Sequence, residues 1–182
     1  DPATTEPEPS TSTTTTTTTP TTTAPADPLL IPTSAGPVRG GPSAVDGVRN
    51  FLAIPYGEPP VGPLAWAPPQ ARASWTDPLD ATVSGASCPQ TTEGITTAFL
   101  VTPDPHPDCL TLSVWSPDGA ADLPVMVWFH GGGLSTGSAH EPYYIGDDLA
   151  AEGVVVVNVN YRLGAFGFLA LPELRDESAD GA

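Results

Sequence analysis

The sequence predicts an α/β fold, and three features of its second half support that prediction. Residues 124–130 (PVMVWFH) and 154–161 (VVVVNVNY) are almost continuously apolar, as expected of strands that helices cover on both faces. Between them, residues 144–153 (YIGDDLAAEG) contain a short helix, with two acidic residues in its first turn and Gly153 at its end. The order strand, glycine-rich loop, helix, strand is typical of an α/β sheet.

The beginning of the chain predicts a disordered tract in front of the domain. Residues 1–28 are nearly all Thr, Pro, Ala, Ser and acidic residues, and they include an unbroken run of Thr at 13–19. Such a segment has too little apolar surface to offset its conformational entropy. It is either a solvated stalk, often O-glycosylated, or an unmodified flexible linker. Because the sequence begins with Asp and has no apolar leader, we expect that a signal peptide has been removed. The domain is then expected over residues 29–182, in a protein that is secreted or associated with the cell envelope.

Short strands and a proline-rich segment are predicted between the tract and the apolar runs. Apolar patterns flanked by Gly, Pro and Asp predict strands at residues 36–40, 48–55 and 110–117. From residue 56 to residue 89, prolines are too dense for a long helix, which predicts a segment that wraps around the surface. We interpret Trp66 and Trp75 as the packing anchors of this segment.

The composition argues against nucleic-acid and membrane partners. The formal net charge is -16, from 5 basic and 21 acidic residues, and this charge repels phosphates and anionic lipid heads. The sequence contains no run of about 20 apolar residues, so it predicts no transmembrane segment.

Two cysteines and three histidines are candidates for redox, nucleophilic or metal chemistry. The even count of cysteines, Cys88 and Cys109, favours a disulfide over free thiols, and such a bridge would restrict the unfolded chain by roughly 3 kcal/mol. A catalytic cysteine is the weaker interpretation, because the nearby His106 lies in a Pro-rich run that predicts an exposed loop. The spacing of His106, His130 and His140 matches no metal-ligand pattern, so we predict no metal site, and no cofactor is predicted either.

The chemistry of the domain depends on how residues 130–137 (HGGGLSTG) are interpreted. The last five residues fit the G-x-S-x-G pattern of a nucleophile elbow, which would make Ser135 the nucleophile. An elbow passes directly from strand to turn to helix, whereas here three glycines come first and Pro142 disfavours a helix soon afterwards. His140 is the only histidine after Ser135 and lies in the same loop, so no separate element can hold it as a base. We therefore interpret the match at Ser135 as coincidental.

The first four residues of this stretch fit an oxyanion-binding loop better. Glycines let the backbone turn sharply and bring bare amide groups to a substrate without obstruction by a Cβ atom. An HGGG loop after a sheet strand supplies such donors in esterases and lipases, and each donor is worth roughly 10²- to 10³-fold in rate. The alternative is that the three glycines form only a flexible turn.

Five stretches across residues 36–169 form a broader pattern: VRNFLAIPYGEPPVGPLAWAPP, ASCPQ, DCLTLSVWSP, LPVMVWFHGGG and VVVVNVNYRLGAFGFL. In their order and spacing they resemble the N-terminal part of the type-B carboxylesterases, the cholinesterase-like branch of the α/β-hydrolase fold. The resemblance implies a disulfide between Cys88 and Cys109 near the mouth of the active-site gorge. It also implies that Gly132 and Gly133 donate backbone N–H groups to an oxyanion, while Gly131 lets the turn form.

The same resemblance places the catalytic triad outside this sequence. In the family, the Ser lies on a later G-E-S-A-G elbow, with an acid and a His farther on, and none of these precedes the final RDESADGA. We therefore expect the N-terminal fragment of an exported carboxylic ester hydrolase, inactive by itself. In the complete protein, a small-molecule ester would react by Ser-His-acid acyl transfer. The alternatives are a non-catalytic cell-surface adhesion or binding module with a hydrolase-like fold, and a product that never folds. The sequence does not predict an oligomeric state.

Three positions depart from the family pattern, and a fourth lacks its implied partner. Ala65 and Pro107 stand where the family has an Arg and a Glu that the resemblance implies to be paired. Because both charged residues are replaced together, no buried charge is left without its partner, so the cost in stability is modest. Leu134 replaces the aromatic residue after the glycines and alters the acyl-side wall. Arg162 is implied to pair with an Asp beyond this sequence, so here we expect it to contact water or another acid.

Overall fold

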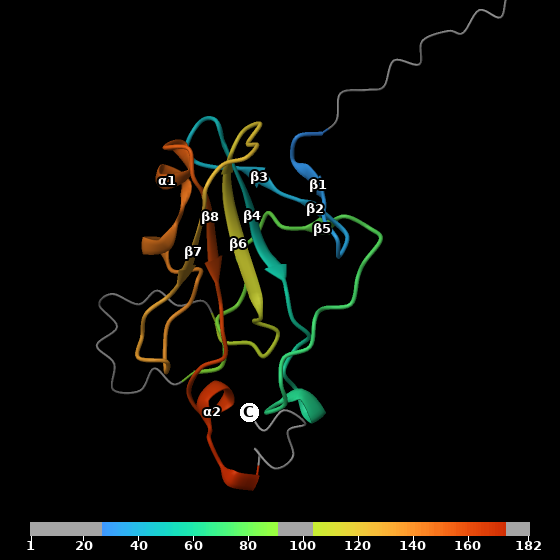
Figure 1. Ribbon diagram of the computed structural model, residues 1–182, viewed down its shortest axis with the longest axis vertical. Coiled ribbons are helices and arrows are strands. Elements are labelled where there is room, and N and C mark those ends of the chain that lie inside the picture. The colour runs from blue at the N-terminus through green and yellow to red at the C-terminus, as the bar shows by residue number, and fades with distance from the viewer. Residues whose placement is uncertain (1–26, 91–103, 174–182) are drawn as a thin grey trace, which may run out of the picture.

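The centre of the computed structural model, which describes residues 27–90 and 104–173, is a five-stranded sheet (Figure 1). In spatial order its strands are β3 (Gly41–Pro42), β4 (Val48–Pro55), β6 (Thr111–Pro117), β8 (Val155–Val159) and β7 (Val125–Phe129). The pairs β3/β4, β4/β6 and β6/β8 are antiparallel, and β7 and β8 are parallel. The disorder predicted for residues 1–28 falls almost wholly outside the described residues.

The predicted strands are confirmed, because each of the five predicted ranges contains one observed strand. The range 36–40 contains β2 (Pro37–Arg39), the middle strand of a second, smaller sheet. Its neighbours are β1 (Leu30–Pro32), which pairs antiparallel, and β5 (Leu79–Asp80), which pairs parallel. The sequence did not predict β1, β3 or β5, because strands of two or three residues are too short to show an alternating pattern.

The helices in the described part of the chain are all short. The predicted helix at 144–153 is α1 (Asp147–Ala151), which packs on β4, β6 and β8. A second helix, α2 (Gly164–Phe168), follows β8, and two 3-10 turns are η1 (Gly62–Leu64) and η3 (Pro142–Tyr144). No helix within residues 27–90 and 104–173 has the length and apolar character needed to cross a membrane.

Buried side chains lie on both faces of the large sheet. Between α1 and the sheet they form a cluster of Val48, Trp115, Ala150 and Val156. On the other face, between the large and small sheets, the cluster consists of Val38, Phe51 and Ala81, with Trp75 packed against it. Figure 1 shows this arrangement, with α1 on one side of the central strands and β1, β2 and β5 on the other. The middle of the sheet is therefore covered on both faces, as predicted for an α/β fold.

The predicted burial of residues 124–130 is wrong for residues 124–129, whereas His130 is buried. Every residue of β7 is exposed, with fractions from 38% at Met126 to 63% at Phe129. The physical reason is its position, since β7 is the edge strand next to β8 and no described strand pairs with its other side. In the neighbouring β8, by contrast, Val156 and Asn158 are buried.

The two tryptophans of the proline-rich segment act as anchors in different ways. Trp75 donates its Nε1–H to the carbonyl of Pro37 at 2.8 Å and packs in the core. Trp66 remains half exposed, stacks on Phe166 of α2 with ring centroids 6.0 Å apart, and donates to the carbonyl of Ala165 at 3.1 Å. Trp66 therefore ties the proline-rich segment to the helix that follows β8.

Candidate functional site

The glycine loop, defined as residues 130–137, follows the end of β7. Gly131, Gly132 and Gly133 are exposed, and the loop turns through a left-handed region. The φ angles are +121° at Gly132, +63° at Gly133 and +61° at Leu134. Glycine adopts such angles at little cost, whereas Leu134 holds one against its normal preference. The surrounding contacts must therefore fix the loop.

The carbonyl of Gly132 closes the glycine loop on itself. It accepts hydrogen bonds from the amides of Ser135 and Thr136, both at 3.1 Å, and from the Thr136 hydroxyl at 3.2 Å. A Cβ atom on Gly132 would overlap the Thr136 carbonyl oxygen, so only glycine fits there. Of the residues that the structure describes, none accepts a hydrogen bond from the amide of Gly132 or Gly133. The loop thus turns a carbonyl inward, and its two adjacent glycine amides have no acceptor within residues 27–90 and 104–173.

The segment after β8 holds the start of the glycine loop. Tyr161 donates its hydroxyl to the carbonyl of His130 at 2.6 Å, and the two rings stack with centroids 4.4 Å apart. Three residues later, the amide of Gly164 donates to the carbonyl of Leu134 at 2.7 Å. These contacts explain how Leu134 is kept in its unfavourable backbone conformation.

Asn160 holds the chain that leaves the glycine loop. Its side chain is buried, and its Oδ1 accepts from the amide of Ala139 at 2.7 Å and from the hydroxyl of Ser138 at 3.3 Å. Its Nδ2 donates to the carbonyl of Ala86 at 2.9 Å. Sequence reasoning did not assign Asn160 this role, and the only signal was a polar residue at the end of an apolar run.

Ser135 has no activating partner in the described structure. Its hydroxyl donates to the carbonyl of Gly133 at 3.2 Å. His130 Nδ1 donates to the carbonyl of Gly131 at 2.8 Å, and His140 Nε2 lies 3.4 Å from the hydroxyl of Thr111. Neither histidine contacts Ser135, so this geometry agrees with the interpretation that its motif match is coincidental.

Both histidines near the loop are held neutral. Burial lowers the pKa of His140 to about 4, and the neighbouring His130 adds to that shift. Burial likewise lowers the pKa of His130, although its hydrogen bond to Gly131 opposes the change. Neither ring therefore places a positive charge next to the glycine loop near pH 7.

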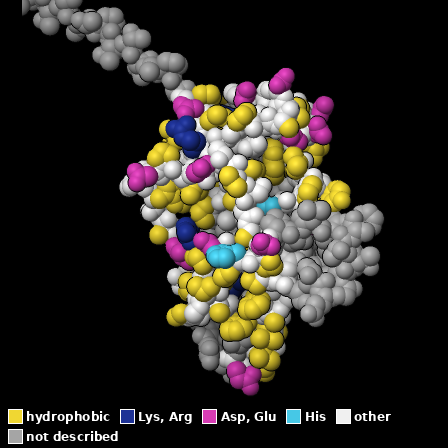
Figure 2. All heavy atoms as spheres, turned by 180° about the vertical axis from the view of Figure 1, so that it is seen from behind, with side chains coloured by type: hydrophobic (Ala, Val, Ile, Leu, Met, Phe, Trp, Pro, Cys, Tyr) yellow, Lys and Arg dark blue, Asp and Glu magenta, His cyan; other side chains and the backbone are white. Residues whose placement is uncertain are grey.

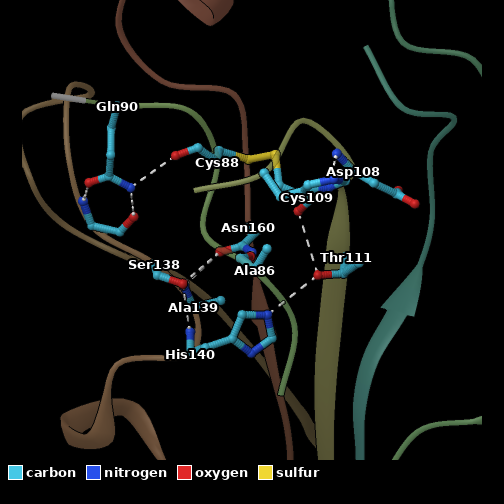
Figure 3. Close-up of a disulfide and its surroundings, with 12 residues drawn as sticks. Ala86, Cys88, Gln90, Asp108, Cys109, Thr111, Ser138, Ala139, His140 and Asn160 are labelled. Carbon is cyan, nitrogen blue, oxygen red and sulfur yellow. Dashed lines mark hydrogen bonds between the residues drawn. A yellow bond between two sulfur atoms is a disulfide. The ribbon is translucent and has the colours of Figure 1, made fainter. Parts of the chain in front are cut away.

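The predicted disulfide between Cys88 and Cys109 is confirmed (Figure 3). Both cysteines are buried and form a core cluster with Leu110 and Leu163. Because Leu163 directly precedes α2 and Cys109 lies just before β6, the bridge packs against the segment that supports the glycine loop. In the described part of the chain, no group of three or more His, Cys, Asp or Glu side chains is arranged to hold a metal ion.

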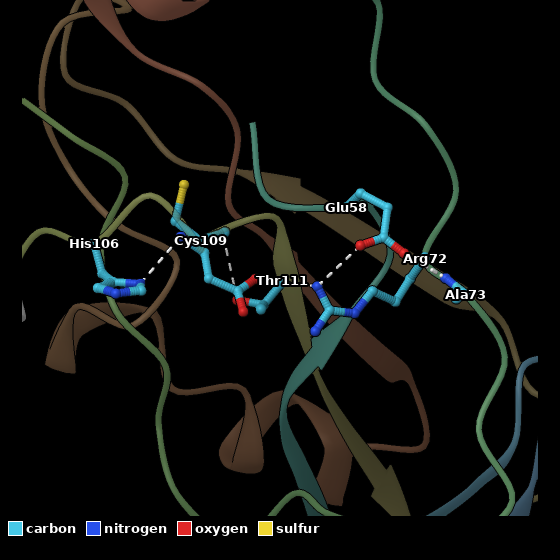
Figure 4. A network of polar contacts seen from close by, with 7 residues as sticks. Glu58, Arg72, Ala73, His106, Cys109 and Thr111 are labelled. Atoms are coloured by element: carbon cyan, nitrogen blue, oxygen red, sulfur yellow. Dashed lines mark hydrogen bonds and ion pairs between the residues drawn. The ribbon is translucent and has the colours of Figure 1, made fainter. Parts of the chain in front are cut away.

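Arg72 forms ion pairs close to the disulfide, since one of its partners, Asp108, directly precedes Cys109. It lies 3.4 Å from Glu58 and 3.6 Å from Asp108, and Glu58 also accepts from the amide of Ala73 at 2.7 Å (Figure 4). All three charged side chains are about a third exposed, so these pairs contribute little to stability.

No acid contacts Arg162 among the described residues, so the structure does not bear out that part of the expectation. Its Nη1 donates to the carbonyls of Ala65 at 3.5 Å and Ala67 at 2.9 Å. Ala65 is the position where the family pattern has an arginine, and its carbonyl is free to accept because it ends a 3-10 turn. Within the described residues, Arg162 is therefore held by backbone oxygens of the proline-rich segment.

Two hollows lie near this region. One of about 460 Å³ adjoins the glycine loop and is lined by Pro89, Gln90, Pro105, Ser135, Leu163, Gly164, Ala165 and Phe166. Another of about 570 Å³ lies beside Trp66, Arg162 and Phe168. Figure 2 shows that apolar side chains predominate at the end of the molecule that carries α2, which is the lower end in that view. The surface beside the loop thus suits a largely apolar ligand.

Comparison with known proteins connects this geometry to one family. Residues 27–181 match the model described as Carboxylesterase family. The chain is 41% identical over 153 residues to the para-nitrobenzyl esterase of Bacillus subtilis, covering 83% of this chain and 31% of that protein. It is 44% identical over 162 residues to the fumonisin B1 esterase of Sphingopyxis macrogoltabida, covering 85% and 28% respectively.

Solved structures agree with this match. A thermophilic PNB esterase superimposes with a TM-score of 0.74 at 42% identity, covering 83% of this chain and 31% of that one. The described fold is therefore the N-terminal part of an α/β-hydrolase sheet, and the chain spans less than a third of the length of these relatives. A family match over most of the sequence, together with these relatives, shows that the chain belongs to the carboxylesterase family.

Proposed function

We propose that this chain is the N-terminal part of a carboxylic ester hydrolase and that Gly132 and Gly133 supply its oxyanion-binding amides. The observation that carries the proposal is the glycine loop itself. Its Gly132 carbonyl is bonded within the loop, while the two exposed glycine amides have no acceptor among the described residues. Membership of the carboxylesterase family supports ester hydrolysis as the reaction.

The chemistry follows from where charge develops during acyl transfer. When a nucleophile attacks the ester carbonyl, the carbonyl oxygen becomes negative, and amide hydrogens fixed at that oxygen stabilise the transition state. Removing one such donor costs about 10²- to 10³-fold in rate. The nucleophile, its base and the acid are expected in the part of the protein that follows this sequence, and the proposed substrate is a small-molecule carboxylic ester.

The hollow beside the loop suits the apolar part of such an ester. Leu163, Ala165 and Phe166 contribute apolar walls to it, and Ser135 borders it from the glycine loop. Leu134 is half exposed at the same loop and would narrow the site less than an aromatic side chain. The esters named for the relatives differ widely, so the proposal extends to the class of substrate and not to one compound.

The first experiment tests whether this chain lacks a nucleophile. The isolated chain is assayed on a short p-nitrophenyl ester and then exposed to a fluorophosphonate, with Ser135→Ala as the matched variant. We expect neither turnover nor serine labelling. Turnover or labelling that disappears in Ser135→Ala would show that Ser135 is the nucleophile and would overturn the assignment of the glycines.

The second experiment tests the glycine loop within a complete enzyme. Residues 27–181 of this chain replace the matching segment of the para-nitrobenzyl esterase, which gives a protein called here the chimaeric esterase. We expect the chimaeric esterase to hydrolyse p-nitrophenyl esters. A folded chimaeric esterase without activity would contradict the proposed role of this chain.

We also propose that the protein is exported. The disulfide between the buried Cys88 and Cys109 supports this, because such bridges persist in oxidising compartments and are rare in the cytosol. The test is to locate the protein in culture supernatant, envelope and cytosolic fractions and to titrate its free thiols. Reduced protein confined to the cytosol would refute export.

A further inference from the structure

The side chain of Gln90 binds the backbone of Gly137 in both directions. Its Oε1 accepts from the amide of Gly137 at 2.8 Å, and its Nε2 donates to the carbonyl of Gly137 at 2.9 Å. The same Nε2 donates to the carbonyl of Cys88 at 3.1 Å. Figure 3 shows the side chain of Gln90 and its hydrogen bond back to Cys88 of the disulfide. Each amide atom thus has a matching partner, which fixes the orientation of the group.

Gly137 in turn packs against the start of the glycine loop. It is buried, with φ of +109°. A Cβ atom there would lie 2.6 Å from His130 Nδ1 and 2.7 Å from the carbonyl oxygen of Gly131. Because these groups are already so close, a displacement of Gly137 must move the backbone next to Gly132.

The other end of the Gln90 contact is fixed by the core. Cys88 is bonded to Cys109, both are buried, and Cys109 lies two residues before the start of β6. Asn160 separately holds the chain after Gly137 through the amide of Ala139. Gln90 therefore connects the segment that precedes β6 of the central sheet to Gly137, the last residue of the glycine loop, whereas Asn160 contacts Ser138 and Ala139.

We propose that Gln90 is a positioning residue, which links the Cys88–Cys109 disulfide to the glycine loop and sets the direction of the Gly132 and Gly133 amides. The catalytic meaning of this inference rests on the proposed function. Its structural part, the dependence of the loop on Gln90, does not. The two parts are tested with different measurements.

Amide hydrogen exchange in the full chain tests the structural part. Gln90→Met keeps the length of the side chain and removes its hydrogen bonds, and Gln70→Met makes the same change at an exposed position. If Gln90 only makes a direct contact with Gly137, its loss accelerates amide exchange at Gly137 and at no other residue of the loop. Positioning requires that Ser135 and Thr136, whose amides bind the Gly132 carbonyl and not Gln90, also exchange about 10-fold faster. Exchange at Val114 in β6 should stay unchanged.

The outcomes separate the possibilities. Faster exchange at Ser135 and Thr136 in Gln90→Met, but not in Gln70→Met, supports positioning, and a change confined to Gly137 overturns it. If Gln90→Met does not fold, Gln90→Glu decides, because its carboxylate still accepts from Gly137 but cannot donate to the carbonyls of Gly137 and Cys88. Unaltered exchange at Thr136 in Gln90→Glu overturns the inference.

Kinetics of the chimaeric esterase test the catalytic part. We expect Gln90→Met to lower kcat about 10-fold with little change in KM, and Gln70→Met to leave both unchanged. A loop that loosens in the exchange experiment while kcat stays constant would refute the role of the glycine amides and leave the positioning intact. An equal loss of kcat in both variants would refute the positioning role in catalysis.

Discussion

Replacing Gly133 by alanine separates the chemistry of the glycine loop from the conformational preference of its backbone. Gly133 has φ of +63°, and no atom lies within 4 Å of the position that a Cβ atom would occupy. The change therefore costs only the left-handed conformation, about 1 kcal/mol of unfolding free energy. Gly119, in the turn between β6 and β7, has φ of +65° and the same open surroundings, which makes Gly119→Ala a matched control.

The two variants should differ in catalysis and not in stability. The open space beside Gly133 is where the proposed substrate would lie, so a methyl group there displaces the ester carbonyl from the amides. A misplacement of about 1 Å costs about 10²-fold in rate. We therefore expect Gly133→Ala in the chimaeric esterase to lower kcat/KM for a p-nitrophenyl ester about 100-fold, while Gly119→Ala keeps full activity.

The assay pairs steady-state kinetics with urea unfolding of both variants. Similar losses of about 1 kcal/mol in both would show that the backbone cost is shared. Equal kcat/KM values in the two variants, at equal stability, would refute the assignment of the glycine amides to the oxyanion. A large loss of stability in Gly133→Ala alone would refute the statement that the position is open.

The remaining predictions concern stability and solubility. His140 stays neutral in the folded chain down to about pH 4, whereas in the unfolded chain it gains a proton below about pH 6.5. The unfolding free energy should therefore fall by about 3 kcal/mol as the pH is lowered from about 6.5 to about 4. His140→Gln should remove most of that slope in urea titrations at several pH values, and the same slope in His140→Gln and in a His106→Gln control would contradict the assignment. Replacing Cys88 and Cys109 together by serine should lower the unfolding free energy by about 3 kcal/mol, given a sequence separation of 21 residues, and an unchanged urea midpoint would speak against a structural bridge. Val127→Lys on the exposed edge strand should reduce aggregation of the isolated chain, measured by light scattering, without changing its unfolding free energy by more than about 0.5 kcal/mol. Undiminished aggregation would show that β7 is not the surface through which the chain aggregates.

Local patterns in the sequence determined the main strands and the character of the glycine loop. Residues 48–55 form a short, partly apolar run flanked by Gly and Pro turn residues, which predicted a strand, and β4 has these bounds. The turn at Gly132 could likewise be expected, because glycine has no Cβ atom and adopts positive φ angles more readily than other residues. The disulfide was favoured by the count of cysteines and implied by the family resemblance, and the structure confirms it.

The tertiary structure alone decided what surrounds these elements. An apolar run such as β7 indicates that a strand can be covered, but its exposure here depends on which strands lie beside it. The support of the glycine loop by Asn160 and by Gln90 joins residues 21 and 47 positions apart, and the Arg162 contact with Ala67 spans 95. The periodicity and the composition of a segment depend on residues that are close together in the sequence. They therefore predict local structure such as strands and turns. Contacts across such distances exist only once the sheet has brought the segments together, so no short pattern encodes them.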